Sequence, residues 1–272
     1  MDARTGKKIR MGRLFGADGH ALLIAYSHGV IRGPIPGLHR GEGLATTLRQ
    51  LRKADGVMVS PGMLPLLEGE FVGADAPALI LMADWQNQGR MHAGTRVYQE
   101  GWSTAMLTAE EAVASGADAI MTYLWIGGSD PRHEAEEIRR NAEFARACER
   151  VGLPLMIESR AIRNEFLPDG SADLELLKFH TRVAAELGAD LIKTVYSGDV
   201  ETFREVVEAT YIPILVAGGS KRADEDALKL AEGTMAAGAA GIVFGRNIFQ
   251  SEDATAALDA FLWIVHAESA AS

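Results

Sequence analysis

Lys193 is the residue whose type and position point most directly to chemistry. It ends a mainly apolar run, residues 189–192, that is typical of a buried β-strand. An ammonium group in such a place is poorly hydrated, so it must be paired or lose its proton, and a neutral amine is a nucleophile. Lys193 is therefore a candidate for a lysine that forms a Schiff base with a carbonyl substrate. The alternatives are a side chain that extends to the surface, or one that pairs with Asp190 or Asp199.

Two glycine-rich segments follow Lys193, each at the expected end of a strand. The first contains Gly218 and Gly219, and the second contains Gly245 and Arg246. Backbone amides can approach a phosphate closely where a residue has no Cβ, and a helix that begins after the second segment would direct its positive end at the same anion. In a (β/α)8 barrel the loops after strands 7 and 8 commonly form such a site. The pair of segments therefore predicts a phosphate site, although a single Gly-Gly is more often only a tight turn.

The elements that would position these residues repeat along the chain. Short apolar runs recur roughly every 31 residues, the size of a βα unit. Residues 130–151, 172–187 and 224–237 have the apolar spacing of helices. The pattern predicts an α/β fold, a (β/α)8 TIM barrel, as one domain over residues 1–272 with a short segment of about 18 residues before the first strand. The eight runs end near Ser27, Ser60, Asp84, Trp125, Glu158, Lys193, Gly218 and Gly245.

Composition agrees with one large enzyme domain. The 272 residues are 47% hydrophobic, and the formal net charge of −10 argues against binding to nucleic acid or to an anionic membrane. The single cysteine, Cys148, cannot form an internal disulfide, and its helical position predicts packing. No apolar stretch approaches a membrane span, and residues 1–13 are basic and polar rather than a signal peptide. We therefore expect a soluble, cytoplasmic protein.

Several motifs occur together along almost the whole chain. They are residues 12–15 (Gly-Arg-Leu-Phe), 27–30 (Ser-His-Gly-Val), 33–38 (Gly-Pro-Ile-Pro-Gly-Leu), 188–193 (Gly-Ala-Asp-Leu-Ile-Lys) and 245–250 (Gly-Arg-Asn-Ile-Phe-Gln). In these motifs the chain resembles the archaeal-type class I fructose-bisphosphate aldolases, together with 2-amino-3,7-dideoxy-heptulosonate synthase and the thiolase that degrades phosphorylated autoinducer-2. The resemblance implies a barrel, a Schiff base on Lys193 without metal or separate cofactor, and a ring-shaped homo-oligomer. It also implies a phosphate cradle at Gly218, Gly219, Gly245 and Arg246.

Two positions depart from this family. Such aldolases usually carry Asp immediately before the His-Gly of the first strand, where this chain has Ser27. They usually carry an acid/base Tyr two residues beyond the end of strand 5, where this chain has Arg160. Arginine stays protonated at any working pH and cannot act as a general base. We therefore expect poor cleavage of fructose 1,6-bisphosphate, while formation of a Schiff base remains expected.

Other side chains could replace the missing acid/base groups. Asp84, Glu158, Tyr123 and His28 are all expected at the C-terminal mouth of the barrel, where catalysis takes place in this fold. A desolvated carboxylate there can have a raised pKa and carry protons in the carbinolamine and enamine steps. The alternative for the carboxylates is an ion pair or a hydrogen bond to a loop amide, and for His28 a structural role.

Arginines near the mouth suggest a second anionic group on the substrate. Arg160, with Arg163 and Arg32, could bind a carboxylate, phosphate or sulfonate bidentately. Arg160 and Ser27 are therefore predicted to contact the substrate. The alternative for Arg163 is a solvated loop that also contains Asn164 and Glu165.

Together these residues predict a class I, metal-independent aldolase-type lyase, or a related transferase, that acts on a phosphorylated ketose or related dicarbonyl. Lys193 would attack the carbonyl, and the iminium would accept electrons during cleavage or formation of the C–C bond. Three alternatives remain: thiolase-like acyl transfer to coenzyme A, a non-catalytic barrel that binds sugar phosphates, and a metal-dependent aldolase. The last is disfavoured because no His, Glu and Asp residues have the spacing of metal ligands.

Overall fold

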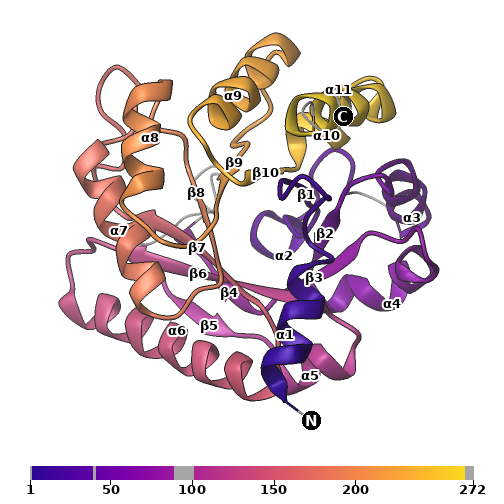
Figure 1. Ribbon diagram of the computed structural model, residues 1–272, viewed down its shortest axis with the longest axis horizontal. Helices are drawn as coiled ribbons and strands as arrows, with labels where there is room; N and C mark the ends of the chain where they lie inside the picture. The colour runs from indigo at the N-terminus through magenta and orange to yellow at the C-terminus, as the bar shows by residue number, and fades with distance from the viewer. Residues whose placement is uncertain (1, 39–40, 89–100, 267–272) are drawn as a thin grey trace.

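Eight parallel strands form a closed barrel in the computed structural model, which describes residues 2–38, 41–88 and 101–266. Neighbouring strands follow the order β1-β10-β9-β8-β7-β6-β3-β2, and helices surround them (Figure 1). The predicted TIM barrel is confirmed, and every predicted apolar run overlaps one of its strands. The strands are β1 (Ala21–Ala25), β2 (Gly56–Val59), β3 (Ala78–Met82), β6 (Ala119–Ile126), β7 (Leu155–Ala161), β8 (Leu191–Thr194), β9 (Ile214–Ala217) and β10 (Gly241–Phe244).

Several helices begin where the sequence supplies a capping side chain. The side chains of Asp130, Asp173 and Asp199 each accept a hydrogen bond from a backbone amide in the first turn of the helix that follows. Within the described ranges, no helix is long and apolar enough to cross a membrane. The helices are α1 (Ala3–Met11), α2 (Gly29–Arg32), α3 (Gly41–Gln50), α4 (Leu64–Leu67), α5 (Ala109–Ala114), α6 (Pro131–Val151), α7 (Leu174–Glu186), α8 (Val200–Glu208), α9 (Asp224–Ala236), α10 (Arg246–Phe249) and α11 (Ala254–Val265), with short 3-10 turns at Pro61–Met63 and Glu68–Phe71.

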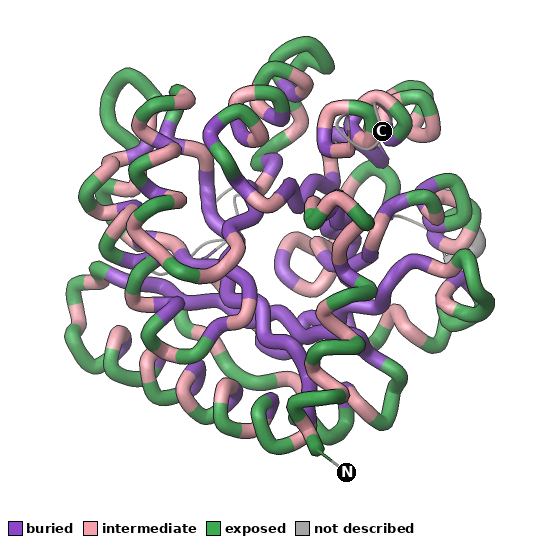
Figure 2. Tube along the Cα trace, in the orientation of Figure 1, coloured by how far each residue is buried: buried purple, intermediate pink, exposed green. Residues whose placement is uncertain are grey.

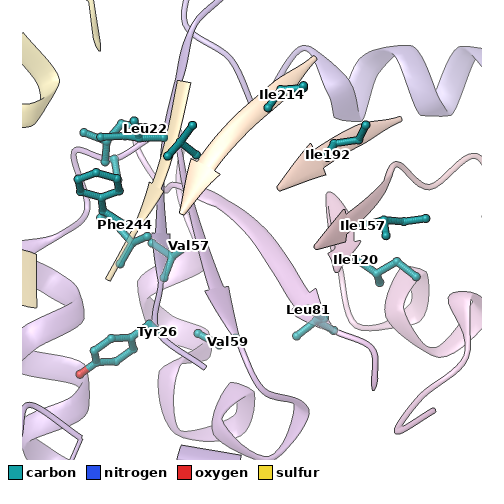
Figure 3. Packing of buried hydrophobic residues seen from close by; sticks show 14 of the residues in the cluster. Leu22, Tyr26, Val57, Val59, Leu81, Ile120, Ile157, Ile192, Ile214 and Phe244 are labelled. Atoms are coloured by element: carbon teal, nitrogen blue, oxygen red, sulfur yellow. The ribbon is translucent and has the colours of Figure 1, made fainter. Parts of the chain in front are cut away.

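Two layers of apolar side chains make up the core. Successive residues of a strand point to opposite faces, so Leu22 and Ile24 pack outward against the helices while Leu23 and Ala25 point into the barrel. Figure 3 shows part of the outer layer, and Figure 2 shows the buried strands inside a ring of helices whose outer faces are exposed. This alternation decides which side chains at the ends of the strands reach the inside of the barrel.

The N-terminal segment closes the end of the barrel where the strands begin. Lys7 of α1 forms ion pairs of 2.9 Å with Glu149 and with Asp190, which directly precedes β8. Arg13 pairs at 2.9 Å with Asp118, just before β6, and the fully buried Leu14 packs in the inner layer. The mouth at the other end, where the strands finish, is left for the functional site.

A two-stranded antiparallel sheet, β4 (Asp84–Gln86) and β5 (Ser103–Ala105), lies beside β6 and was not predicted. It begins two residues after β3 ends at Met82. The apolar run that predicted a strand ending at Asp84 therefore covers the end of one strand and the start of another. This difference changes the place of Asp84, as the site shows.

Candidate active site

The inward face of the barrel brings polar side chains together at the ends of two neighbouring strands, β7 and β8. Met156 of β7 and Leu191 of β8 belong to the inner layer, so Glu158, Arg160 and Lys193, two or four residues further along, point the same way. All three line one cavity of about 1130 Å³. Its place at the carboxyl ends of the strands is where barrel enzymes carry their active sites.

The cavity gathers every predicted site residue except Asp84. No group of three or more His, Cys, Asp or Glu residues in the described part of the chain is arranged to hold a metal ion. The predicted residues that line the cavity are Ser27, His28, Tyr123, Glu158, Arg160, Lys193, Gly218, Gly219, Gly245 and Arg246.

Lys193 is held inside the cavity wall by one carboxylate. Its Nζ lies 2.6 Å from Oε2 of Glu158, and both residues are buried. The two other partners that the sequence offered are engaged elsewhere: Asp190 pairs with Lys7, and Asp199 caps α8 by accepting from the Thr202 amide. The amine therefore shares a short hydrogen bond with a group that can take its proton.

Arg160 lies beside this pair and is itself paired. Its Nε and Nη2 donate to the two oxygens of Glu165 at 2.7 and 2.5 Å, and its Nη1 lies 3.5 Å from Oε1 of Glu158. The guanidinium also lies over the Trp125 ring, 5.7 Å from the ring centroid. The prediction that Arg160 binds a second substrate anion loses support, because the fork that would grip an oxyanion already grips Glu165. The sequence placed Glu165 in a solvated loop, and it gave no local signal of this pairing.

Tyr123 and Trp125 form an aromatic wall on β6. Their rings stack with centroids 6.2 Å apart and 16° between their planes. Burial raises the pKa of the Tyr123 phenol well above its usual value, and the charges of Glu158 and Asp84 add to this effect. The phenol therefore stays protonated near neutral pH, so it can donate a hydrogen bond in the cavity but cannot act there as a base.

Asp84 lies outside the barrel wall, which corrects its predicted place at the mouth. Its carboxylate accepts from the backbone amide of Tyr123 at 3.0 and 3.1 Å and from Nε of Arg140 at 3.1 Å. Arg140 also donates to Glu137 at 2.6 Å and to the carbonyl of Tyr123 at 2.6 Å. Burial raises the pKa of Asp84 to about 8, an effect that the Arg140 charge opposes. The Asp84 carboxylate binds the backbone of the aromatic wall and does not line the cavity.

This buried group predicts a large effect on stability. Replacing Arg140 with Met leaves Asp84 and Glu137 buried without their cation, so the free energy of unfolding should fall by about 3–5 kcal/mol. Urea unfolding measures this change. The control is Arg139→Met, one residue away on α6, where exposed pairs with Glu136 and Glu143 contribute about 0–1 kcal/mol. Equal losses in the two variants would contradict a structural role for the buried group.

Cationic groups gather on the side of the cavity that follows the neighbouring strands β1 and β10. Burial and the nearby charge of Arg32 together lower the pKa of Arg246 to about 10. Burial also lowers the pKa of His28 to about 3, with the charges of Arg246, Lys193 and Arg32 adding to the shift, so this ring is neutral. Nδ1 of His28 and Nε of Arg246 are buried without a hydrogen-bond partner among residues 2–38, 41–88 and 101–266. An anion bound here would relieve the repulsion between the two guanidinium groups.

The glycines next to this cationic cluster have structural causes that the sequence analysis did not give. A Cβ on Gly245 would lie 2.3 Å from the carbonyl oxygen of Ala25, and one on Gly218 would lie 2.8 Å from the Phe244 ring. Gly219 has a φ of +69°, which side chains rarely tolerate. Close packing and backbone conformation therefore require these glycines whether or not a ligand binds. A branched residue at Gly245 would disturb β1 and would not test phosphate binding cleanly.

The same loops nevertheless offer hydrogen-bond donors. In the described part of the chain, the backbone amides of Gly219, Ser220, Gly245 and Arg246 donate to no backbone acceptor. The loops are braced from behind: Nη2 of Arg246 donates to the Gly219 carbonyl at 2.7 Å, and Nδ2 of Asn247 donates to the Gly218 carbonyl at 2.7 Å. Unpaired amides beside a cationic cluster are features of an anion site.

Comparison with known proteins agrees with this geometry. Residues 26–251 match the DeoC/LacD family aldolase profile. The chain is 32% identical to the 2-amino-3,7-dideoxy-D-threo-hept-6-ulosonate synthase of Halobacterium salinarum, covering 96% of this chain and 92% of that protein. It is 30% identical to a solved archaeal fructose 1,6-bisphosphate aldolase, with a TM-score of 0.80 over 96% of this chain and 99% of that one.

A second solved archaeal fructose-1,6-bisphosphate aldolase has its catalytic lysine covalently bound to the carbinolamine intermediate of the substrate. It is 29% identical to this chain, with a TM-score of 0.78 over 96% of this chain and 99% of that one. Profile, relatives and fold all agree with the resemblance seen in the sequence. The protein is an aldolase-type lyase that belongs to the DeoC/LacD aldolase family.

Proposed function

We propose that this lyase works through a Schiff base on Lys193, formed with the carbonyl of a phosphorylated ketose or a related anionic carbonyl compound. The observation that carries the proposal is the 2.6 Å contact between Nζ of Lys193 and the Glu158 carboxylate inside the cavity. The covalent lysine intermediate in the related solved aldolase supports it. We also propose, from the resemblance alone, a cytoplasmic homo-oligomer.

The contact supplies the proton transfers that the first steps need. Glu158 takes a proton from the Lys193 ammonium, and the neutral amine attacks the carbonyl carbon. Glu158 gives its proton to the oxygen and takes one from the nitrogen, which yields a neutral carbinolamine; it then protonates the hydroxyl, which leaves as water, and an iminium remains. During cleavage the ionised Glu158 takes the proton of the substrate's β-hydroxyl, which becomes the carbonyl of the released aldehyde, and the electron pair of the breaking C–C bond moves into the iminium to give an enamine. The protonated phenol of Tyr123 can stabilise oxygen atoms of the substrate.

The cationic side of the cavity is the proposed phosphate site. Arg246 and Arg32 supply charge there, and the amides of Gly219 and Ser220 are available as donors. Substrates are thereby oriented with the phosphate near β9 and β10 and the carbonyl near Lys193 on β8.

A substitution at Arg246 tests this site. Arg246→Gln should weaken the binding of dihydroxyacetone phosphate by about 10-fold to 100-fold, because a hydrogen bond to a charged group contributes about 1.5–3 kcal/mol. The binding of dihydroxyacetone, which has no phosphate, should weaken much less. Both are measured from the concentration dependence of the borohydride-reduced adduct.

The matched control for Arg246→Gln is Lys229→Gln. Lys229 also lines the cavity, but it is already paired with Glu225 at 2.6 Å. The Lys229→Gln substitution should leave the affinities for both ligands almost unchanged. Equal weakening of the phosphorylated and unphosphorylated ligands by Arg246→Gln would remove Arg246 from the phosphate site.

The substrate is proposed to differ from fructose 1,6-bisphosphate. Ser27 and Arg160 stand where the resembling aldolases carry Asp and Tyr, and Arg160, which is bound to Glu165, stays protonated and cannot act as a general base. Steady-state cleavage of fructose 1,6-bisphosphate, compared with a panel of phosphorylated and carboxylated ketoses, tests this point. Efficient cleavage of the bisphosphate would show that the two substitutions do not change the reaction.

A further inference from the structure

Four charged side chains alternate in sign from the loop after β7 to the proposed nucleophile. Glu165 binds Arg160, Arg160 lies 3.5 Å from Glu158, and Glu158 binds Lys193 at 2.6 Å. Glu165 is the first of the four in this series, and its side chain is only 10% exposed. A carboxylate so buried, and so close to the cavity, needs a reason beyond surface solvation.

The geometry around Arg160 is asymmetric. Glu165 takes both Nε and Nη2, at 2.7 and 2.5 Å, which fixes the plane of the guanidinium. Glu165 also accepts from the backbone amide of Ala161 at 3.1 Å, so the pair is anchored to the end of β7. Only Nη1 is left toward Glu158, at a distance longer than a hydrogen bond. Glu165 therefore keeps Arg160 near Glu158 without letting it bind that carboxylate tightly.

This geometry decides which cation forms a hydrogen bond with the Glu158 carboxylate. An Arg160 released from its partner could approach Glu158 to hydrogen-bond distance and compete with Lys193 for the carboxylate. Glu158 would then be a weaker proton acceptor for the amine. With Glu165 in place, the carboxylate remains bonded to Lys193.

We propose that Glu165 is a positioning residue for the lyase reaction: by occupying the fork of Arg160 it keeps Glu158 free to exchange a proton with Lys193. This inference rests on the proposed Schiff-base function. It assigns a role to the arginine that stands where the resembling aldolases carry tyrosine, since here Arg160 tunes the acid/base group instead of being one.

Other charged and titratable groups face Glu158 or Lys193 and must be the same in every variant compared. They are Arg32 after β1, Tyr123 on β6 and His28, which faces Lys193. Because none of them is altered below, opposite changes in two variants must come from the Glu165 and Arg160 pair.

The experiment uses the full chain and dihydroxyacetone phosphate as the probe. The initial rate of adduct formation, trapped with cyanoborohydride and read by intact mass, is measured against pH. Glu165→Gln leaves the charge of Arg160 uncompensated, which favours ionised Glu158, so the acid limb of the profile should move to lower pH and the maximal rate should fall. Arg160→Gln removes that charge, so the acid limb should move to higher pH, by roughly one pH unit.

Three further variants separate positioning from a structural effect. Arg160→Lys restores the charge and should return the acid limb toward that of the unaltered protein. Asp169→Asn makes the same carboxylate-to-amide change in an exposed residue of the same loop, where the Asp169 carboxylate accepts from Ser171, and should change nothing. The double variant Glu165→Gln with Arg160→Gln should follow Arg160→Gln, because Glu165 acts through the arginine.

The failures of the two proposals are distinguishable. Absence of an adduct in the unaltered protein would contradict the Schiff-base function itself. A normal adduct in the unaltered protein, with acid limbs that move in the same direction or not at all in Glu165→Gln and Arg160→Gln, would overturn the positioning role and leave the Schiff base standing.

Discussion

Replacing Lys193 with Met should abolish turnover while the protein still folds. Met keeps an apolar stem of similar length in the buried end of β8, but it removes the amine that forms the covalent intermediate. Steady-state rates should therefore fall by several orders of magnitude. The reduced adduct should disappear, as measured by intact mass.

Folding and specificity need separate controls for this variant. Removing Lys193 leaves Glu158 with one cation fewer, so thermal unfolding of Lys193→Met must be compared with that of the unaltered protein. Lys178→Met is the matched control, because Lys178 lies on α7 and pairs only with carboxylates at the surface. A Lys193→Met protein that keeps near-normal turnover would exclude the Schiff-base mechanism.

Replacing Glu158 with Gln should lower turnover by about 100-fold to 10,000-fold, the usual contribution of a positioned acid/base group. Gln has a similar shape and can still accept a hydrogen bond from Nζ of Lys193, but it cannot take the proton. Formation of the adduct should be slowed along with turnover. Single-turnover trapping with dihydroxyacetone phosphate measures the covalent step directly.

The conservative variant Glu158→Asp shows whether the loss of turnover in Glu158→Gln comes from the missing carboxylate. Glu158→Asp keeps a carboxylate at a greater distance from Lys193 and should recover part of the lost rate. If Glu158→Gln formed the adduct at the normal rate, proton transfer would have to come from another group. Tyr123 could not be that group near neutral pH, because its buried phenol stays protonated.

The barrel could be predicted because its signals are local and periodic. Each strand is a short apolar run bounded by glycine or a polar residue, and two of the three predicted helices have a capping residue in front of them: Asp130 precedes α6 and Asp173 precedes α7. The place of Lys193 followed from the same pattern. The end of the apolar run predicted a buried amine, and the structure showed its direction, because Leu191 of the same strand belongs to the inner layer.

The pairing of charges could not be predicted, because it depends on where strands end and how loops return. Asp84 was expected at the mouth, but β3 ends at Met82 and the chain turns into β4. Arg140 lies on a helix rich in surface charge, and only the packing of α6 against β6 shows that it is buried. The pair of Arg160 with Glu165 requires the exact return of the loop after β7, which no sequence period describes.

The glycines of the predicted phosphate site have a structural cause that the sequence pattern did not reveal. Gly218 and Gly245 do lie beside the cationic side of the cavity. Their missing Cβ atoms make room for Phe244 and for the Ala25 carbonyl, however, and not for a ligand. Close packing between neighbouring barrel strands produces the same residue choice as phosphate binding, so the sequence alone cannot separate the two.

Mapping the reduced adduct directly tests whether the Schiff base forms on Lys193. The protein is treated with borohydride in the presence of dihydroxyacetone phosphate and a panel of phosphorylated ketoses, digested, and its peptides are identified by mass. A Schiff base on Lys193 predicts a single modified lysine, Lys193, and no modification in the Lys193→Met variant. Modification of a different lysine, or no adduct with any ketose of the panel, would contradict it.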